Sequence, residues 1–154
     1  MGIFDWFKKK EKTSQSGDFD DKIETTYDLL MTFFQVQSVM TEGSLVPKDS
    51  LPKDEWVYGY MYGFIDCYFQ ASVLKDSENA WMIVTIRIFK AYFGDKLGND
   101  ICHKFPDLQK KDKFSTGVKT GGQDLFDFMK DEKMSPMGLQ FYLFKFMKTS
   151  KGKE

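Results

Sequence analysis

Few residues of this 154-residue chain could form a polar site. Arg87 is the only arginine, and it lies between Ile86 and Ile88 in an apolar segment with helical spacing. A buried guanidinium requires a carboxylate partner, because an unpaired buried charge is strongly destabilising. Asp66 is the first candidate for this partner and Asp124 the second. The pattern predicts a structural ion pair inside a helical bundle. The alternatives are a pocket for a small polar ligand, or an Arg87 side chain that snorkels outward.

Tyrosine hydroxyls could complete such a pocket. Four tyrosines fall within residues 56–74: Tyr58, Tyr60, Tyr62 and Tyr68. Tyr62 joins Asp66, Arg87 and Asp124 as a candidate ligand-pocket residue. The structural alternative is that these tyrosines are core residues whose hydroxyl groups reach the surface.

Metal-binding and catalytic patterns are weak. His103 is the only histidine, and with the adjacent Cys102 it would supply at most two of the three or four ligands that such metal sites need. The chain also lacks the EF-hand spacing, a Glu-x-x-His pair, a nucleophile elbow, a Walker loop and a dinucleotide-binding fingerprint. We therefore expect no metal and no cofactor, and we favour a non-enzymatic function.

Composition narrows the class of protein further. The formal net charge is −1 and the isoelectric point is about 5.9, which argues against a nucleic-acid binder. No secretory signal precedes the two cysteines, so we expect reduced thiols and a cytoplasmic protein. The opening MGIFDWFKKKEK is typical of small bacterial helical proteins, so we also expect a bacterial source. Residue 6 is Trp rather than Ser or Thr, so the myristoylation pattern fails.

Residues 1–17 form an amphipathic arm and a polar linker. The arm contains Phe4, Trp6 and Phe7, and a run of lysines follows them. Aromatic side chains beside lysines are typical of a segment that lies in the membrane interface. The structural alternative is an arm that packs against its own core or against a neighbouring subunit.

The segment 56–74 is apolar on every side, and a helix of this kind is either buried or in a membrane. It is rich in Tyr and poor in Leu. Asp66 near its middle would cost about 2.5–3.5 kcal/mol on insertion into a bilayer. We therefore predict the central helix of a soluble all-α domain.

Further helices are predicted at 19–42, 78–93, 116–132 and from 136 to 149, with a weaker helical segment at 99–105. The short turn at 75–77 predicts an antiparallel hairpin of the helices 56–74 and 78–93. The fold class is thus all-α: a single-domain bundle of about five helices spanning 18–149, followed by a basic tail at 150–154.

A short motif, G-x3-G-x2-D, occurs twice, at Gly59–Asp66 and at Gly117–Asp124. Glycine costs about 1 kcal/mol relative to alanine inside a helix, so its repeated use at i, i+4 spacing predicts a close approach between helices. The motif either marks a duplicated helical hairpin or is a coincidence.

The last predicted helix is apolar on most sides. Five residues are expected to face inward: Leu139, Tyr142, Leu143, Phe146 and Met147. Phe141 and Phe144 would then face outward, unless the N-terminal arm or a second subunit covers them. We therefore favour an interaction or regulatory module that binds a protein partner or self-associates. The alternatives are a membrane-peripheral protein anchored by the N-terminal arm, and a small-ligand binder with a pocket around Asp66, Arg87 and the tyrosines.

Overall fold

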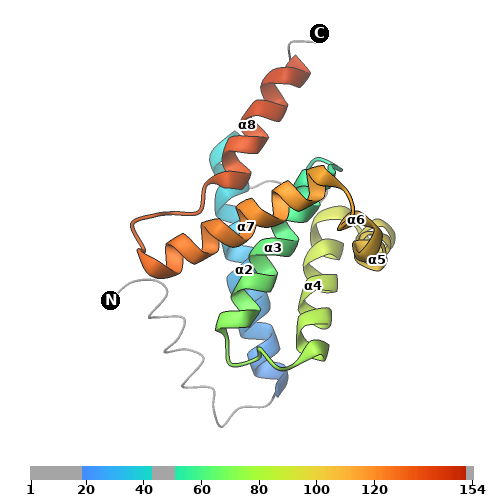
Figure 1. Cartoon of the computed structure of the whole chain (residues 1–154), viewed down its shortest axis with the longest axis vertical. Coiled ribbons are helices and arrows are strands. Elements are labelled where there is room, and N and C mark those ends of the chain that lie inside the picture. The colour runs from blue at the N-terminus through green and yellow to red at the C-terminus, as the bar shows by residue number, and fades with distance from the viewer. Residues whose placement is uncertain (1–18, 43–50, 152–154) are drawn as a thin grey trace.

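The computed structural model describes residues 19–42 and 51–151, and all regular structure in these ranges is helical (Figure 1). The all-α prediction is therefore confirmed. The helices follow in the order α2 (Phe19–Glu42), α3 (Glu55–Ala71), α4 (Glu78–Phe93), α5 (Asp95–His103), α6 (Phe105–Leu108), α7 (Asp112–Lys130) and α8 (Gly138–Lys151).

Helix α3 is the most deeply buried element, as its apolar sequence predicts. Its N-cap is Asp54, whose carboxylate accepts hydrogen bonds from the backbone N–H of Trp56 at 2.8 Å and of Val57 at 3.4 Å. Such a cap satisfies N–H groups that have no partner within the helix. Helices α3 and α4 run antiparallel, as the short connection predicts (Figure 1).

The tightest contact of α3 is with α7, through four glycines that interlock. Gly59 and Gly63 lie against the backbone of α7, and Gly117 and Gly121 lie against the backbone of α3. The partners, in the same order, are Phe114, Val118, Trp56 and Tyr60. A Cβ atom at any of the four glycines would overlap a backbone carbonyl oxygen of the other helix. The predicted close approach is thus confirmed, and the repeated motifs lie against each other. Their origin by duplication stays a prediction.

Helix α5 extends the molecule where the sequence predicts only a weak helical segment. Gly94, with φ of 86°, joins α4 to α5. This value of φ is readily adopted only by glycine. Gly98, within α5, lies against the backbone of Phe89 and Lys90, so α5 folds back closely onto α4.

Aromatic side chains connect the helices. Phe33 and Phe34 of α2 both contact the ring of Phe64, with ring centroids 5.2 and 5.3 Å apart. Phe33 also meets Phe128 of α7 edge to face. The apolar residues of α2 therefore contact several neighbouring helices, as its two apolar stripes predict.

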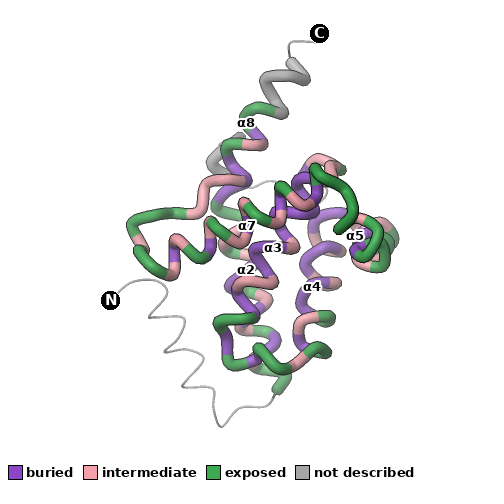
Figure 2. The backbone as a smooth tube through the Cα atoms, in the orientation of Figure 1, coloured by how far each residue is buried: buried purple, intermediate pink, exposed green. Residues whose placement is uncertain are grey.

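Helix α8 begins against α2 and the middle of α7 and then projects away from the other helices (Figure 1). In Figure 2 the first turns of α8 contain both buried and exposed residues. Within the described ranges, none of the helices has the length and apolar character needed to cross a membrane.

Candidate functional site

Arg87 does not pair with Asp66, so that prediction is wrong. Its guanidinium instead binds Glu24 of α2 in a bidentate pair, with Nη1–Oε1 at 2.5 Å and Nη2–Oε2 at 3.3 Å. The guanidinium also lies over the ring of Tyr27, 4.1 Å from its centroid. The side chains of Arg87 and Glu24 are 38% and 56% exposed, so the pair lies at the surface.

Asp66 points elsewhere for a local reason. Its Oδ2 accepts a hydrogen bond from the Gln70 amide at 2.7 Å, one turn further along α3. Arg87 sits on the side of α4 that faces α2, where Glu24 lies. The sequence indicates that Arg87 needs a carboxylate, but the choice among several carboxylates depends on how α2 packs beside α4.

Asp124 takes part in a polar network that joins four helices. Its Oδ2 accepts hydrogen bonds from the Tyr60 hydroxyl at 2.7 Å and from the Gly138 N–H at 2.8 Å. Gln37 Oε1 accepts from the Leu139 N–H at 3.1 Å and lies 3.2 Å from the Tyr60 hydroxyl. Burial, with the nearby carboxylate of Asp124, raises the pKa of Tyr60 well above its ordinary value. The hydroxyl therefore stays a donor, and the network fixes the start of α8.

Tyr62 lies in a third environment. Its hydroxyl accepts a hydrogen bond from the Gln109 amide at 3.0 Å. Its ring packs edge to face against Phe105 and Trp81. The structure therefore places the four predicted pocket residues apart: Arg87 beside α2, Asp66 on its own helix, Asp124 under α8 and Tyr62 among aromatic rings.

An open groove of about 470 Å³ lies between α2 and α4, along residues 27–35 of α2 and beside Ala91 and Tyr92 of α4. Tyr27 and Asp28 belong to its lining, so the groove begins next to the Arg87–Glu24 pair. The Tyr92 hydroxyl is buried and has no hydrogen-bond partner among the described residues. Burial raises the pKa of Tyr92 strongly, so this hydroxyl stays protonated.

A second, smaller cavity of about 130 Å³, which is open to the surface, lies between α4, α5 and α6. Cys102 and His103 contribute to its wall. Burial raises the pKa of the Cys102 thiol to about 12, so the thiolate needed for nucleophilic chemistry is scarce at neutral pH. His103 Nδ1 lies 2.8 Å from the Asn99 carbonyl oxygen, which can only accept, so Nδ1 carries the proton.

Sequence reasoning missed this cavity. Its wall includes Trp81 and Thr85, which are one turn apart on α4. Neither residue belongs to a motif, and an apolar helix face of this kind usually packs in a core. The cavity exists because α5 and α6 fold back beside that face. In the described ranges, no cluster of three or more His, Cys, Asp or Glu side chains could hold a metal ion.

The outward face of α8, the last helix, exposes two phenylalanine side chains. Phe141 and Phe144 are 58% and 41% exposed, whereas Leu139 and Leu143 are buried. The predicted division into inward and outward faces is thus confirmed for these four residues. The side chains of Phe146 and Met147 lie outside those that the structure describes, and so do Phe4, Trp6 and Phe7 of the N-terminal arm.

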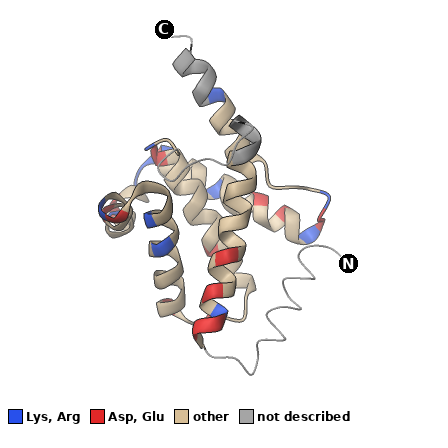
Figure 3. Ribbon diagram, turned by 180° about the vertical axis from the view of Figure 1, so that it is seen from behind, with Lys and Arg blue, Asp and Glu red and all other residues tan. Residues whose placement is uncertain are grey.

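Charge is unevenly distributed between the two ends of the bundle. Acidic side chains gather on the first turns of α2, where Asp20, Asp21 and Glu24 lie (Figure 3). Helix α8 contains three lysines and no acidic residue in its sequence GLQFYLFKFMKTSK. A surface that is complementary in charge to the sequence of α8 would therefore be acidic.

Comparison with known proteins adds no relative: no protein-family model, no curated protein and no solved structure matches this chain significantly.

Proposed function

We propose that this protein is a non-enzymatic interaction module, and that the outward face of α8 binds an acidic, partly apolar surface of a protein partner. The observation that carries this proposal is the exposure of Phe141 and Phe144 on a helix that projects from the bundle. Exposed aromatic side chains that lie close together are typical of interaction sites.

The start of α8 is held rigidly, which suits a docking element. The N–H groups of Gly138 and Leu139 donate to Asp124 and Gln37, from two different helices. The ring of Tyr142 stacks on Trp56, with centroids 4.1 Å apart and planes at 9°. A pre-positioned helix loses less conformational entropy on binding than a free segment does.

The charge of α8 argues for a partner of opposite sign. Its lysines are Lys145, Lys148 and Lys151. The sequence of α8 is basic, and like charge disfavours the pairing of two such segments. The acidic first turns of α2 in a second copy, where Phe19 is 44% exposed, offer the complementary chemistry. The test below distinguishes self-association of this kind from binding to a different acidic protein.

The test compares the wild type with the double variant Phe141→Ser/Phe144→Ser. Phe126→Ser is the matched control, because Phe126 is 53% exposed on a different helix, α7. Analytical ultracentrifugation over a wide concentration range measures self-association. Quantitative capture, followed by reconstitution with each purified candidate, measures a different partner.

We expect the wild type and the Phe126→Ser control to bind the partner, and the double variant to lose this binding. High salt should weaken the binding, because it screens charge pairing. Equal binding by all three proteins would contradict the proposal. Co-sedimentation with anionic vesicles tests the membrane-peripheral alternative, with a version lacking residues 1–12 beside the full chain. Vesicle binding that depends on residues 1–12, without any protein partner, would favour that alternative.

A further inference from the structure

The groove between α2 and α4 has an apolar floor and a polar edge. Its buried or half-buried lining residues are apolar or aromatic: Tyr27, Met31, Ala91 and Tyr92. Its exposed lining residues are polar: Asp28, Thr32 and Gln35. A cavity of roughly 150 Å³ holds one benzene ring, so a groove of about 470 Å³ has room for more than one aromatic side chain.

A stripe of exposed acidic side chains leads along α2 to this groove. Asp20, Glu24 and Asp28 follow each other at i, i+4 spacing, which places them on one face of the helix. Arg87 pairs with Glu24, so Asp20 and Asp28 carry the negative charge of this stripe (Figure 3). Asp28 also belongs to the lining of the groove. This face of α2 is therefore acidic on the approach to the groove and apolar within it.

The N-terminal arm carries the complementary chemistry in the same order, counted from Phe19. Along the arm, the lysines of residues 8–12 come first and the aromatic segment 4–7 comes next. Along α2, the acidic stripe comes first and the apolar floor of the groove comes next. The arm up to Lys12 contains four lysines and two acidic residues, so it is basic. A chain that turns back at Phe19 therefore brings lysines beside acidic groups and aromatic side chains to the groove.

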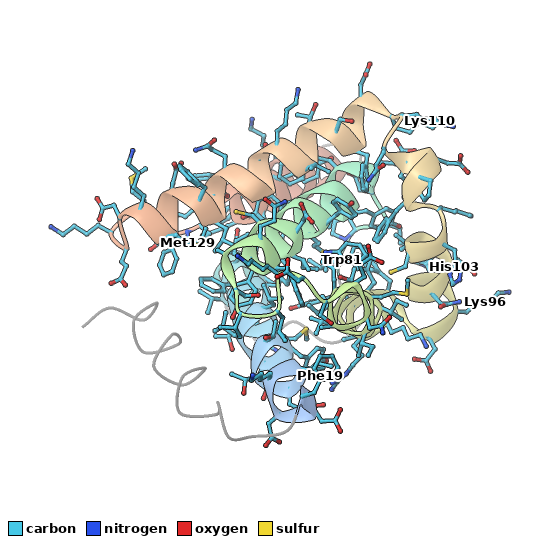
Figure 4. The ribbon with its side chains drawn as sticks, turned by 60° about the horizontal axis from the view of Figure 1, so that its bottom comes forward. Phe19, Trp81, Lys96, His103, Lys110 and Met129 are labelled. Atoms are coloured by element: carbon cyan, nitrogen blue, oxygen red, sulfur yellow. The ribbon has the colours of Figure 1, made fainter. Side chains whose placement is uncertain are left out.

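The length of the chain before Phe19 permits this contact. In Figure 4, Phe19 marks the end of α2 at which the arm joins the bundle. Gln35, the last residue of α2 in the groove lining, lies about 24 Å along the helix from Phe19, at 1.5 Å per residue. The chain between Phe7 and Phe19 spans up to about 40 Å when extended. The aromatic segment can therefore reach every part of the groove.

We propose that the α2–α4 groove is the docking site of the protein's own N-terminal arm. The aromatic side chains of the segment 4–7 cover the floor formed by Met31 and Tyr92, and the lysines of residues 8–12 lie beside Asp28 and the first turns of α2. Tethering favours this occupant over a separate molecule, because a short linker gives an attached segment an effective concentration on the order of millimolar.

Docking of the arm has a consequence for its other possible contact. A membrane surface would bind the same aromatic side chains and lysines, so the docked arm is unavailable to it. The inference does not rest on the α8 docking surface, although an arm beside the acidic turns of α2 would compete there with the α8 helix of a second copy.

The test follows the Trp6 indole N–H of the full-length protein by NMR in the presence of a soluble paramagnetic agent, which broadens signals that face the solvent. The indole signals of Trp56 and Trp81, in α3 and α4, show in the same spectrum whether each variant is folded. Protection of Trp6 from broadening measures docking of the arm.

Three variants separate the parts of the contact. Asp28→Lys reverses the charge at the edge of the groove. Asp100→Lys is its matched control, because Asp100 is an exposed aspartate on α5 that does not line the groove. Ala91→Phe fills the groove. In the arm, Phe4→Ser/Phe7→Ser removes two aromatic side chains and leaves the bundle unchanged, so the test stays decisive even if Ala91→Phe does not fold.

We expect Trp6 to be protected in the wild type and in Asp100→Lys at every protein concentration. Asp28→Lys should lower the equilibrium constant for docking about fivefold, as reversal of an exposed charge beside opposite charges does. High salt should weaken docking in the wild type, because it screens the same charges. Ala91→Phe and the double variant of the arm should both expose Trp6.

Four results would overturn the proposal. The first is a Trp6 signal that is as accessible in the wild type as in Ala91→Phe and in the double variant of the arm. The second is an equal loss of docking in Asp28→Lys and Asp100→Lys. Protection that appears only at high protein concentration would place the arm on a second copy. Protection that appears only after anionic vesicles are added would place it on a membrane surface.

Discussion

The α3–α7 and α2–α4 interfaces join helices in opposite ways. Between α3 and α7, four glycines bring backbone against backbone, and there is no room for a methyl group. Between α2 and α4, a surface ion pair lies beside an open groove of about 470 Å³. The first interface fixes the architecture by shape. The second tolerates change, because its polar contacts are exposed and part of its length is not packed.

We expect the largest loss of stability when a methyl group is added in the α3–α7 interface. Gly121→Ala would place a methyl group on the backbone of Tyr60, and we expect a loss of about 3 kcal/mol in the free energy of unfolding. Gly122→Ala is the control. Its Cβ would lie 3.6 Å from the nearest atom, Gly63 O, so it should stabilise the helix by up to about 1 kcal/mol. Urea unfolding of both variants measures the difference, and equal midpoints would show that the two helices are not in contact here.

We expect an intermediate loss of stability when Asp54, at the end of the same interface, is replaced. Asp54 caps α3 and also accepts a hydrogen bond from Lys113 of α7 at 2.7 Å, and its side chain is only 9% exposed. Asp54→Ala should therefore cost about 1–2 kcal/mol. Asp54→Asn keeps a good capping residue but loses the charge, so it should cost less.

The pH dependence of this contact has a definite sign. Burial alone would raise the pKa of Asp54, but hydrogen bonds from Lys113, Tyr142 and the Trp56 N–H outweigh it and lower the pKa. The resulting stabilisation is complete above the unfolded-state value of about 3.9 and is lost as the pH falls through the lowered folded-state value. Urea unfolding at several pH values should show the gap between wild type and Asp54→Asn shrinking below pH ~4. A gap that stays constant down to strongly acidic pH would contradict this prediction.

We expect the smallest effect on stability from loss of the Arg87–Glu24 ion pair in the α2–α4 interface. Exposed ion pairs contribute little, so a double-mutant cycle of Arg87→Met and Glu24→Gln should give a coupling of about 0.5 kcal/mol. The coupling should fall with added salt. A coupling as large as the Gly121→Ala loss would remove the contrast between the two interfaces.

Prediction from sequence succeeded where periodicity decides the outcome. The bounds of α2 and α4 agree with the helices predicted from apolar spacing at 19–42 and 78–93. The N-cap of α4 is Ser77, whose side chain accepts from the Ala80 N–H at 3.2 Å. The glycine spacing predicted a close contact between helices. It did not predict that Gly63 would lie against Val118, because spacing within a helix does not select the partner helix.

The candidate pocket shows the limit of the same reasoning. The sequence predicted a carboxylate partner for Arg87 because it predicted a buried guanidinium, whereas the pair lies at the surface. Several aspartates and glutamates fitted that prediction equally well. Tertiary packing selected Glu24, since α2 rather than α3 presents a carboxylate to that side of α4. The cavity behind Trp81 and Thr85 gave no sequence signal, because it exists only where α5 and α6 fold back beside α4.

The sequence by itself determined the all-α class, the buried character of 55–71 and the two faces of the first turns of α8, because these follow from local hydrogen bonding and apolar periodicity. Only the tertiary structure decided that Asp124 binds Tyr60 and Gly138, that Arg87 binds Glu24, and where space remains between helices. These contacts join residues that are far apart in the chain. They depend on which helix faces pack together, and no local pattern specifies that choice.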